Sequence, residues 1–186
     1  SDGIMIARGD LGVELPIYQL PVYQRRIAEM AHKYGKPVIM ATELMKSMVK
    51  SPYPTRAEVS DVFNSVMARV DATMLSDETA VGLYPVRTVE YMAKTVKEGE
   101  NEIVDPHHDF ELQSDDENEF LKKALAKHAL MLADEAKAKA VIVFSSTGKL
   151  AQYLSALKPN QPVYSFTTDY NTHFSFGVNY AIFSEL

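Results

Sequence analysis

Three short apolar segments recur along the first hundred residues, each followed by polar residues and then by a helical pattern. Polar residues stand at the carboxyl ends of these segments roughly 33 residues apart, a normal β-strand-plus-helix repeat. Segments that are apolar throughout are typical of strands buried on both faces of a parallel sheet. The sequence therefore predicts an α/β fold in which helices cover a parallel sheet. The segments are 3–7, 37–42 and 72–76.

The helices between these segments carry recognisable signals at their ends. A helix is expected from Pro21 to Tyr34, because apolar residues recur there at helical spacing and Gly35 follows as a C-terminal glycine. Thr55 with Glu58 three residues later forms a capping-box pattern that begins a second helix. A third helix is expected over about 85–98. Three such units cannot close a barrel, so the fold is either a small open sheet or a piece of something larger.

The polar residues at the strand ends are Asp10, Thr42 and Ser76. Both (β/α)₈ barrels and open α/β sheets build their active sites at the carboxyl ends of parallel strands. Asp10 lies in a glycine-bearing turn, where backbone N–H groups can approach an anion and a carboxylate can bind a hard cation. By composition alone this signal is weak, since a single Asp after a strand more often serves a turn, and Thr or Ser there more often caps a strand end.

The composition changes beyond the third helix. Residues 101–118 are polar and acidic and read as a linker between a first domain, 1–100, and a second, 119–186. His107, His108 and Asp109 could bind a metal, but a solvated linker is the better interpretation because nothing nearby supplies a fixed third ligand. The second domain is expected to be another α/β unit with helices over 119–139, from the turn 145–148 to about 158, and near 172–176, and strands over 140–144, 163–166 and 181–183.

Two groups of apolar residues in the second domain carry expectations about packing. The long helix should be amphipathic, with one apolar stripe on which His128 packs either in the core or at an interface. The aromatic residues near the C-terminus should lie in the core. The stripe consists of Leu121, Ala124, Leu125, His128 and Leu132, and the aromatic residues are Tyr170, Phe174, Phe176 and Tyr180.

Composition excludes several classes of function. The formal net charge of −6 and scattered Lys and Arg argue against nucleic-acid binding. The absence of cysteine excludes disulfides and thiolate metal sites, which fits a reducing cytoplasm. No apolar run approaches the roughly 20 residues that span a bilayer, so no membrane segment is expected.

Four segments resemble pyruvate kinases, in the order and at the spacing of that family: 2–14, 36–42, 51–62 and 74–80. The resemblance implies the last three βα units of a (β/α)₈ TIM barrel, followed by a truncated C-terminal α/β domain with a parallel sheet. The ends of the chain likewise read as cut points. The implied activity is phosphoryl transfer from phosphoenolpyruvate to ADP, giving pyruvate and ATP in glycolysis.

The resemblance also assigns roles to residues of the predicted site. It makes Asp10 a ligand of Mg²⁺ or Mn²⁺, and it places the substrate carboxylate on backbone N–H groups around Ala7, Gly9 and Asp10. The Thr42 hydroxyl would contact the substrate near the carbon that becomes the enolate. Ser76 would belong to a hydroxyl and water relay that delivers a proton, with Glu78 in the same loop. These assignments fit a reaction that needs cation stabilisation and then a proton.

The chain departs from the family at two positions and lacks other parts of its site. Glu43 stands where the family usually has Gln, and Asp77 where it usually has Gly, a position that Asp tolerates if a positive φ is needed. The family's catalytic Lys, its second acidic metal ligand and its K⁺ site belong to the earlier half of the barrel. The isolated chain is therefore expected to be inactive, and exposed sheet edges should make it self-associate. The family also implies a cytoplasmic homo-oligomer, a tetramer.

A second candidate site lies in the second domain. The residues Ser145, Ser146, Thr147, Gly148 and Lys149 open a helix after a strand, an arrangement that suits phosphate, and they are similar to the loop of regulated pyruvate kinases that holds a sugar-phosphate effector. An ordinary helix cap explains them equally well. A Walker A motif is excluded because the earlier Gly is absent and Leu150 replaces the Ser or Thr.

Two alternatives to a phosphotransferase remain. One is a non-catalytic module that binds an effector and contacts other subunits, which predicts phosphate binding at 145–149 without turnover. The other is a metal-dependent barrel of the 2-keto-acid aldolase or lyase type. That alternative shares the chemistry of enolate stabilisation, but it does not explain the loop at 74–80 or the second domain.

Overall fold

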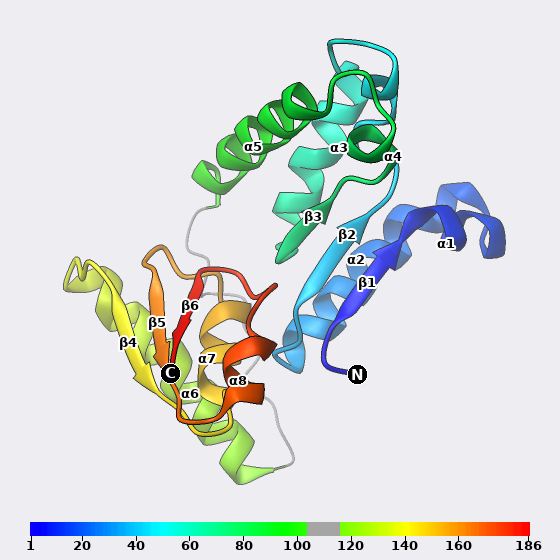
Figure 1. Cartoon of the computed structure of the whole chain (residues 1–186). Coiled ribbons are helices and arrows are strands. Elements are labelled where there is room, and N and C mark those ends of the chain that lie inside the picture. The colour runs from blue at the N-terminus through cyan, green and yellow to red at the C-terminus, as the bar shows by residue number, and fades with distance from the viewer. Residues whose placement is uncertain (104–115) are drawn as a thin grey trace. The chain divides into compact units, whose positions relative to one another are not determined.

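The structure, a computed structural model, describes residues 1–103 and 116–186 (Figure 1). Among these, contacts group residues 4–29 and 38–103 into one compact unit and residues 1–3, 30–37 and 116–186 into another. The two units are taken separately below. Most of the predicted linker, including His107, His108 and Asp109, lies outside the described residues.

The first unit contains a parallel sheet of three strands in the order β1-β2-β3. The strands are β1 (Ile4–Ala7), β2 (Val38–Ala41) and β3 (Ala72–Met74). In the register of the sheet Ala7 pairs with Ala41, and Ala41 pairs with Met74, so the three strands end side by side. This is the parallel α/β arrangement that the apolar segments predicted.

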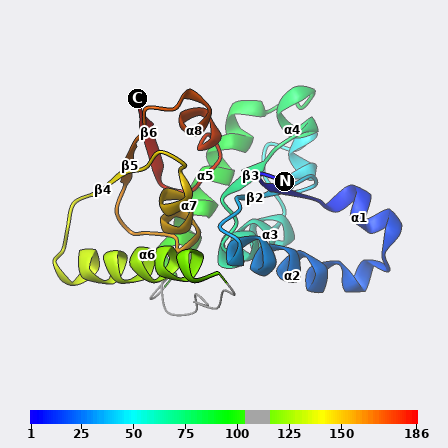
Figure 2. The same cartoon turned by 90° about the horizontal axis from the view of Figure 1, so that it is seen from below.

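The helical elements of this part of the chain follow each strand (Figures 1 and 2). They are α1 (Arg8–Glu14), η1 (Ile17–Gln19), α2 (Leu20–Lys33), η2 (Lys46–Val49), α3 (Arg56–Met67), α4 (Asp77–Ala80) and α5 (Pro85–Asn101). Helices α3 and α5 lie side by side, because Gly99 lets α5 approach Val66 so closely that a Cβ at Gly99 would stand 3.0 Å from the Val66 side chain. Buried residues such as Val38, Met40 and Val62 form the apolar interior of this unit.

Residues 8–14 form a helix, whereas the sequence predicted a flexible turn. Gly9 and Gly12 have a low helix preference, but tertiary contacts override it. The Arg8 side chain, on the first residue of α1, is held by hydrogen bonds to the backbone after β2. The helix start is thereby fixed to the neighbouring strand.

The second unit also contains a three-stranded parallel sheet, in the order β4-β5-β6. Its core, with Leu130, Tyr153, Leu157 and Phe176 among its members, packs α6 and α7 on one face of the sheet. The elements are α6 (Glu117–Glu135), β4 (Val141–Phe144), α7 (Lys149–Ala156), β5 (Val163–Phe166), α8 (Tyr170–Ser175) and β6 (Ile182–Glu185).

The structure contradicts two expectations of core packing in this unit, the second of them only in part. Helix α6 buries Ala126, Leu130 and Ala133 against the core, whereas the predicted stripe is largely exposed. The face that α6 packs against α7 includes Lys123 and Leu130, and it differs from the stripe that the apolar period indicated. Of the aromatic residues, Phe176 is buried, but Tyr170 and Phe174 are 67% and 70% exposed.

Candidate functional site

The carboxyl edge of the β1-β2-β3 sheet gathers the predicted catalytic residues. Asp10 lies in the first turn of α1, directly after β1, and Thr42 is the first residue after β2. Ser76 follows β3 and serves as the N-cap of α4, whose second residue is Glu78. The paired strand ends therefore place all four residues at one edge of the sheet.

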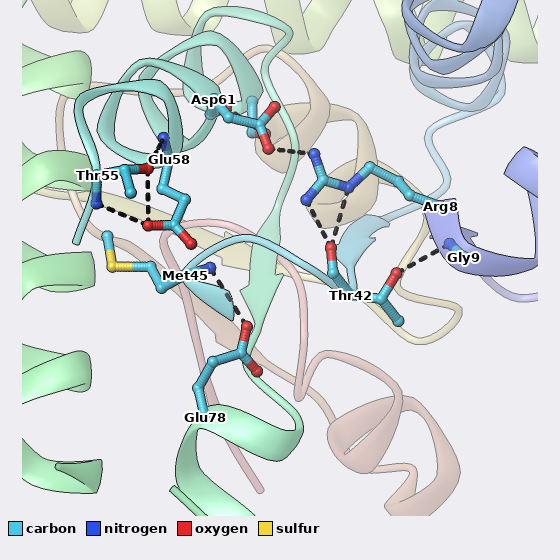
Figure 3. Close-up of polar contacts among 9 residues, drawn as sticks. Arg8, Gly9, Thr42, Met45, Thr55, Glu58, Asp61 and Glu78 are labelled. Carbon is cyan, nitrogen blue, oxygen red and sulfur yellow. Dashed lines mark hydrogen bonds and ion pairs between the residues drawn. The ribbon is translucent and has the colours of Figure 1, made fainter. Parts of the chain in front are cut away.

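Thr42 joins the ends of β1 and β2 (Figure 3). Its hydroxyl oxygen accepts a hydrogen bond from the backbone N–H of Gly9, with the nitrogen and oxygen 3.1 Å apart. Its backbone is left-handed, with φ at 70°, and Glu43 follows with φ at 56°. Such conformations are unfavourable for residues other than Gly, above all for a β-branched one, and persist only where surrounding contacts impose them.

The contacts on the other side of Thr42 come from Arg8. Its guanidinium donates to the Thr42 carbonyl oxygen from Nε at 3.0 Å and from Nη2 at 2.5 Å. Nη1 forms an ion pair with Asp61 of α3 (Figure 3). The Arg8 side chain is only 8% exposed. Sequence reasoning gave neither residue a role, although a charged residue between a buried strand and Gly9 was a signal that could have been followed.

Glu78 connects the loops that follow β2 and β3. Its carboxylate accepts hydrogen bonds from the backbone N–H of Met45 at 3.3 Å and from that of Ser76 at 2.9 Å, and the Ser76 hydroxyl lies 3.5 Å from the same carboxylate. Glu78 is 1% exposed. A buried carboxylate that accepts these hydrogen bonds is held in one position. Its contact with the Ser76 hydroxyl places the two side chains next to each other at the end of β3.

The N-terminus of α3 holds the loop that follows β2, through the side chain of Glu58. The predicted capping box is confirmed: Thr55 accepts from the Glu58 N–H at 3.2 Å, and Glu58 accepts from the Thr55 N–H at 2.7 Å. Glu58 also accepts from the N–H and the hydroxyl of Ser47, both at 2.6 Å. Partial burial acts to raise the pKa of Glu58, but the hydrogen bonds from Ser47 and Thr55 outweigh it and hold that pKa below its ordinary value.

The two departures from the family pattern have different surroundings. Asp77 begins α4 and is not among the residues with positive φ, so nothing in its backbone requires Gly. Its carboxylate pairs with the Lys46 ammonium at 2.6 Å, and this hydrogen bond is the main reason that the pKa of Lys46 is raised. Glu43 is exposed beside Thr42.

The donors at this edge fit a divalent cation only in part. Asp10 is exposed, and one or two carboxylates with substrate oxygens are a usual set of ligands for Mg²⁺. Among residues 1–103 and 116–186, however, no group of three or more His, Asp or Glu side chains comes together to hold a metal. Asp10 is therefore suited to be one ligand among several.

The predicted effector residues form the loop between β4 and α7. The Ser145 hydroxyl accepts from the Gly148 N–H at 2.9 Å, and the Ser146 carbonyl accepts from the Thr172 hydroxyl at 3.3 Å. Gly148 has φ at 71°, where a Cβ would lie 2.8 Å from Phe176. Ser146 and Thr147 are exposed. The loop is an ordered turn with two exposed hydroxyl side chains at the start of a helix.

The fold and the strand-end residues define an α/β protein with two parallel sheets in series and a polar site at the carboxyl edge of the first. Comparison with known proteins identifies the family. The model described as pyruvate kinase, barrel domain, matches residues 1–89, and the model described as pyruvate kinase, alpha/beta domain, matches residues 123–182. This chain belongs to the pyruvate kinase family.

Individual relatives agree with the family models. A pyruvate kinase from Chlamydia muridarum is 39% identical over all of this chain, and pyruvate kinase 1 from Trypanosoma brucei brucei is 42% identical over 92% of it. The crystal structure of a pyruvate kinase from Cryptosporidium parvum matches the whole chain with a TM-score of 0.89 and 33% identity. The chain spans 39%, 35% and 38% of these three proteins, respectively.

Within the described residues, none of the helices combines the length and apolar character that crossing a membrane requires.

Proposed function

We propose that this chain supplies part of a pyruvate kinase active site, which transfers the phosphoryl group of phosphoenolpyruvate to ADP and yields pyruvate and ATP. The observation that carries the proposal is the hydrogen bond from the Gly9 N–H to the Thr42 hydroxyl, which joins two of the predicted substrate-binding residues across neighbouring strand ends. Catalysis of phosphoryl transfer depends mainly on positioning and on charge stabilisation, and this edge provides groups for both.

The substrate carboxylate would bind the backbone N–H groups around Ala7, Gly9 and Asp10. In the structure, the Gly9 N–H donates to the Thr42 hydroxyl. A carboxylate oxygen is a stronger acceptor than a hydroxyl, because charge-assisted hydrogen bonds are roughly twice as strong as neutral ones. Binding would therefore release the Thr42 hydroxyl, which could then turn toward the substrate carbon.

A divalent cation, Mg²⁺ or Mn²⁺, would be held by Asp10 together with substrate oxygens. When bound, such a cation supplies positive charge that stabilises the transferring phosphoryl group and the developing enolate. The K⁺ expected from the family has no site assigned to this chain.

The proton needed to convert the enolate to pyruvate would pass through the hydroxyl of Ser76. Glu78 is the residue that orients this hydroxyl, because its carboxylate contacts both the Ser76 N–H and the Ser76 hydroxyl. A hydroxyl relays a proton without adding charge to a site already crowded by anions, which explains why a neutral side chain would occupy this place.

Titration of the ¹⁵N-labelled 186-residue chain with phosphoenolpyruvate tests the site. With Mg²⁺ present, the amide signals of Gly9 and Asp10 should move. Both should move much less without the metal, and the Gly9 signal should move much less in Asp10→Ala. The signals of Val163 and Phe166, on β5 of the second unit, serve as internal controls. No movement at Gly9 at saturating substrate would argue against a substrate site at this edge.

The remaining assignments concern organisation and regulation. We propose domain limits at 1–100 and 119–186 joined by 101–118, a cytoplasmic homo-oligomer, and a sugar-phosphate site at residues 145–149. The exposed hydroxyl side chains of Ser146 and Thr147 beside Lys149 support the effector site. Titration with inorganic phosphate should shift the amide signals of Gly148 and Lys149, whereas unchanged signals would leave this loop as a helix cap alone.

A further inference from the structure

We infer that Asp61 and Arg8 are positioning residues that hold Thr42 in its left-handed conformation and so keep its hydroxyl directed at the Gly9 N–H. This inference rests on the proposed function for its consequence, but its structural part can be tested separately. The side-chain contacts of Arg8 and Asp61 are with the Thr42 carbonyl oxygen and with each other, not with the groups expected to bind substrate. Their proposed effect is exerted through Thr42.

The first step of the argument is the strain at Thr42. A left-handed β-branched residue followed by a second left-handed residue, Glu43, is strained at both positions and persists only where other contacts impose it. The hydrogen bond between the Thr42 hydroxyl and Gly9 is made by the side chain and lies at an exposed position, so it is a weak restraint by itself. A stronger contact must act on the backbone.

Arg8 supplies that contact. Two of its nitrogens converge on one acceptor, the Thr42 carbonyl oxygen, and this fixes the direction of the carbonyl. Because the guanidinium is planar and its donors form a rigid fork, the carbonyl cannot turn without losing both hydrogen bonds. A Lys at this position would keep the charge but not the fork.

Asp61 in turn fixes Arg8. A guanidinium that is almost fully buried is costly unless it is paired, and Asp61 is the carboxylate with which it forms an ion pair. The Asp61 side chain is 38% exposed, so it can be neutralised with less disturbance of packing than Arg8 itself. Helix α3 thereby controls a backbone conformation at the end of β2, through a residue of α1.

The same arrangement links two parts of the proposed site. Arg8 immediately precedes Gly9 and Asp10, so the residue that fixes Thr42 belongs to the turn that would bind substrate and metal. If Arg8 loses its partner, both the Thr42 carbonyl and the start of α1 lose a restraint. The Thr42 hydroxyl would then compete less for the Gly9 N–H, but the Gly9 and Asp10 N–H groups at the start of α1 would also be held less firmly. We expect this loss of positioning to dominate and to weaken binding of the substrate carboxylate.

The test uses amide hydrogen exchange in the 186-residue chain, with the Gly9 amide as the reporter. In Asp61→Asn, exchange at Gly9 should accelerate about tenfold relative to the unmodified chain, while the strand amides of Ile6 and Met40 stay within about twofold. Asp61→Glu should restore slow exchange, and Arg8→Lys should behave like Asp61→Asn. The matched control is Glu29→Gln, which removes an exposed ion pair with Arg25 that has no contact with Thr42.

Each outcome decides the inference. Unchanged exchange at Gly9 in Asp61→Asn would overturn it, and so would an equal acceleration at Gly9, Ile6 and Met40, because that pattern reports a general loss of stability. Phosphoenolpyruvate titration of the same variants, with Mg²⁺, gives the functional readout. If the unmodified chain does not bind phosphoenolpyruvate but Gly9 still responds to Asp61→Asn, the proposed function fails and the positioning role stands.

Discussion

The carboxylate of Glu78 lies within 3.3 Å of the backbone nitrogen of Met45, and this hydrogen bond joins the loop after β3 to the loop after β2. Both loops carry proposed catalytic hydroxyls, on Ser76 and Thr42. A single buried side chain thus sets the distance between two strand-end loops that are far apart in the sequence.

Replacing Glu78 by Gln should lower stability by about 1–3 kcal/mol. The two carboxylate oxygens accept from Met45 and Ser76, and an amide in the same place has only one acceptor oxygen, so one buried N–H loses its partner. Urea unfolding of the 186-residue chain measures the difference. Glu90→Gln, at an exposed position on α5, is the control and should change stability by less than about 0.5 kcal/mol.

The contribution of Glu58 to stability should depend on pH. Its pKa is lower in the folded protein than its ordinary value of 4.5, so the folded state favours the ionised form. The resulting stabilisation is complete above pH 4.5 and is lost as the pH falls through the folded pKa. The stability difference between the unmodified chain and Glu58→Gln should therefore shrink as the pH is lowered below 4.5. A difference that stays constant down to pH 2 would contradict this assignment.

Tyr153→Phe should destabilise the second unit by roughly 1–2 kcal/mol. The Tyr153 hydroxyl donates to the Glu119 carboxylate, joining α7 to α6. Burial and this partner raise the pKa of Tyr153, and the same hydrogen bond lowers the pKa of Glu119. Thermal unfolding of the variant checks the stability, and ¹³C titration should find the pKa of Glu119 closer to its ordinary value. Tyr170→Phe, at an exposed position, is the control.

Gly148→Ala should destabilise the loop between β4 and α7 by about 1–3 kcal/mol. Its φ of 71° disfavours a side chain, and the new Cβ would stand 2.8 Å from Phe176 and 3.0 Å from Thr172. Gly177→Ala is the matched control, because its Cβ would meet nothing closer than 3.6 Å. Equal unfolding midpoints in urea for the two variants would contradict the reading of Gly148.

Much of the fold followed from local patterns in the sequence. The apolar strands at 3–7, 37–42 and 72–76 and the capping box at Thr55 were predicted because each depends on neighbouring residues. The placement of Asp10, Thr42 and Ser76 at one edge also followed, since parallel strands align their carboxyl ends. The structure agrees with these predictions within a few residues.

Features that depend on distant contacts were not predictable in this way. The helix at residues 8–14 and the left-handed Thr42 depend on the contacts of Arg8, whose partners lie 34 and 53 residues away. The buried face of α6 depends on its packing against α7, which the local apolar period does not encode. The roles of Arg8 and Asp61 were missed because nothing local in the sequence connects them.

The most direct test of the central claim is the formation of pyruvate from phosphoenolpyruvate and ADP, with Mg²⁺ and K⁺ present. The chain is joined to the N-terminal portion of the Chlamydia muridarum relative, and the joined protein is compared with its Asp10→Ala variant and with the 186-residue chain alone. We expect activity in the joined protein, a loss of at least about a hundredfold in Asp10→Ala, and none in the isolated chain. A folded joined protein without activity, or one whose activity survives Asp10→Ala, would contradict the account.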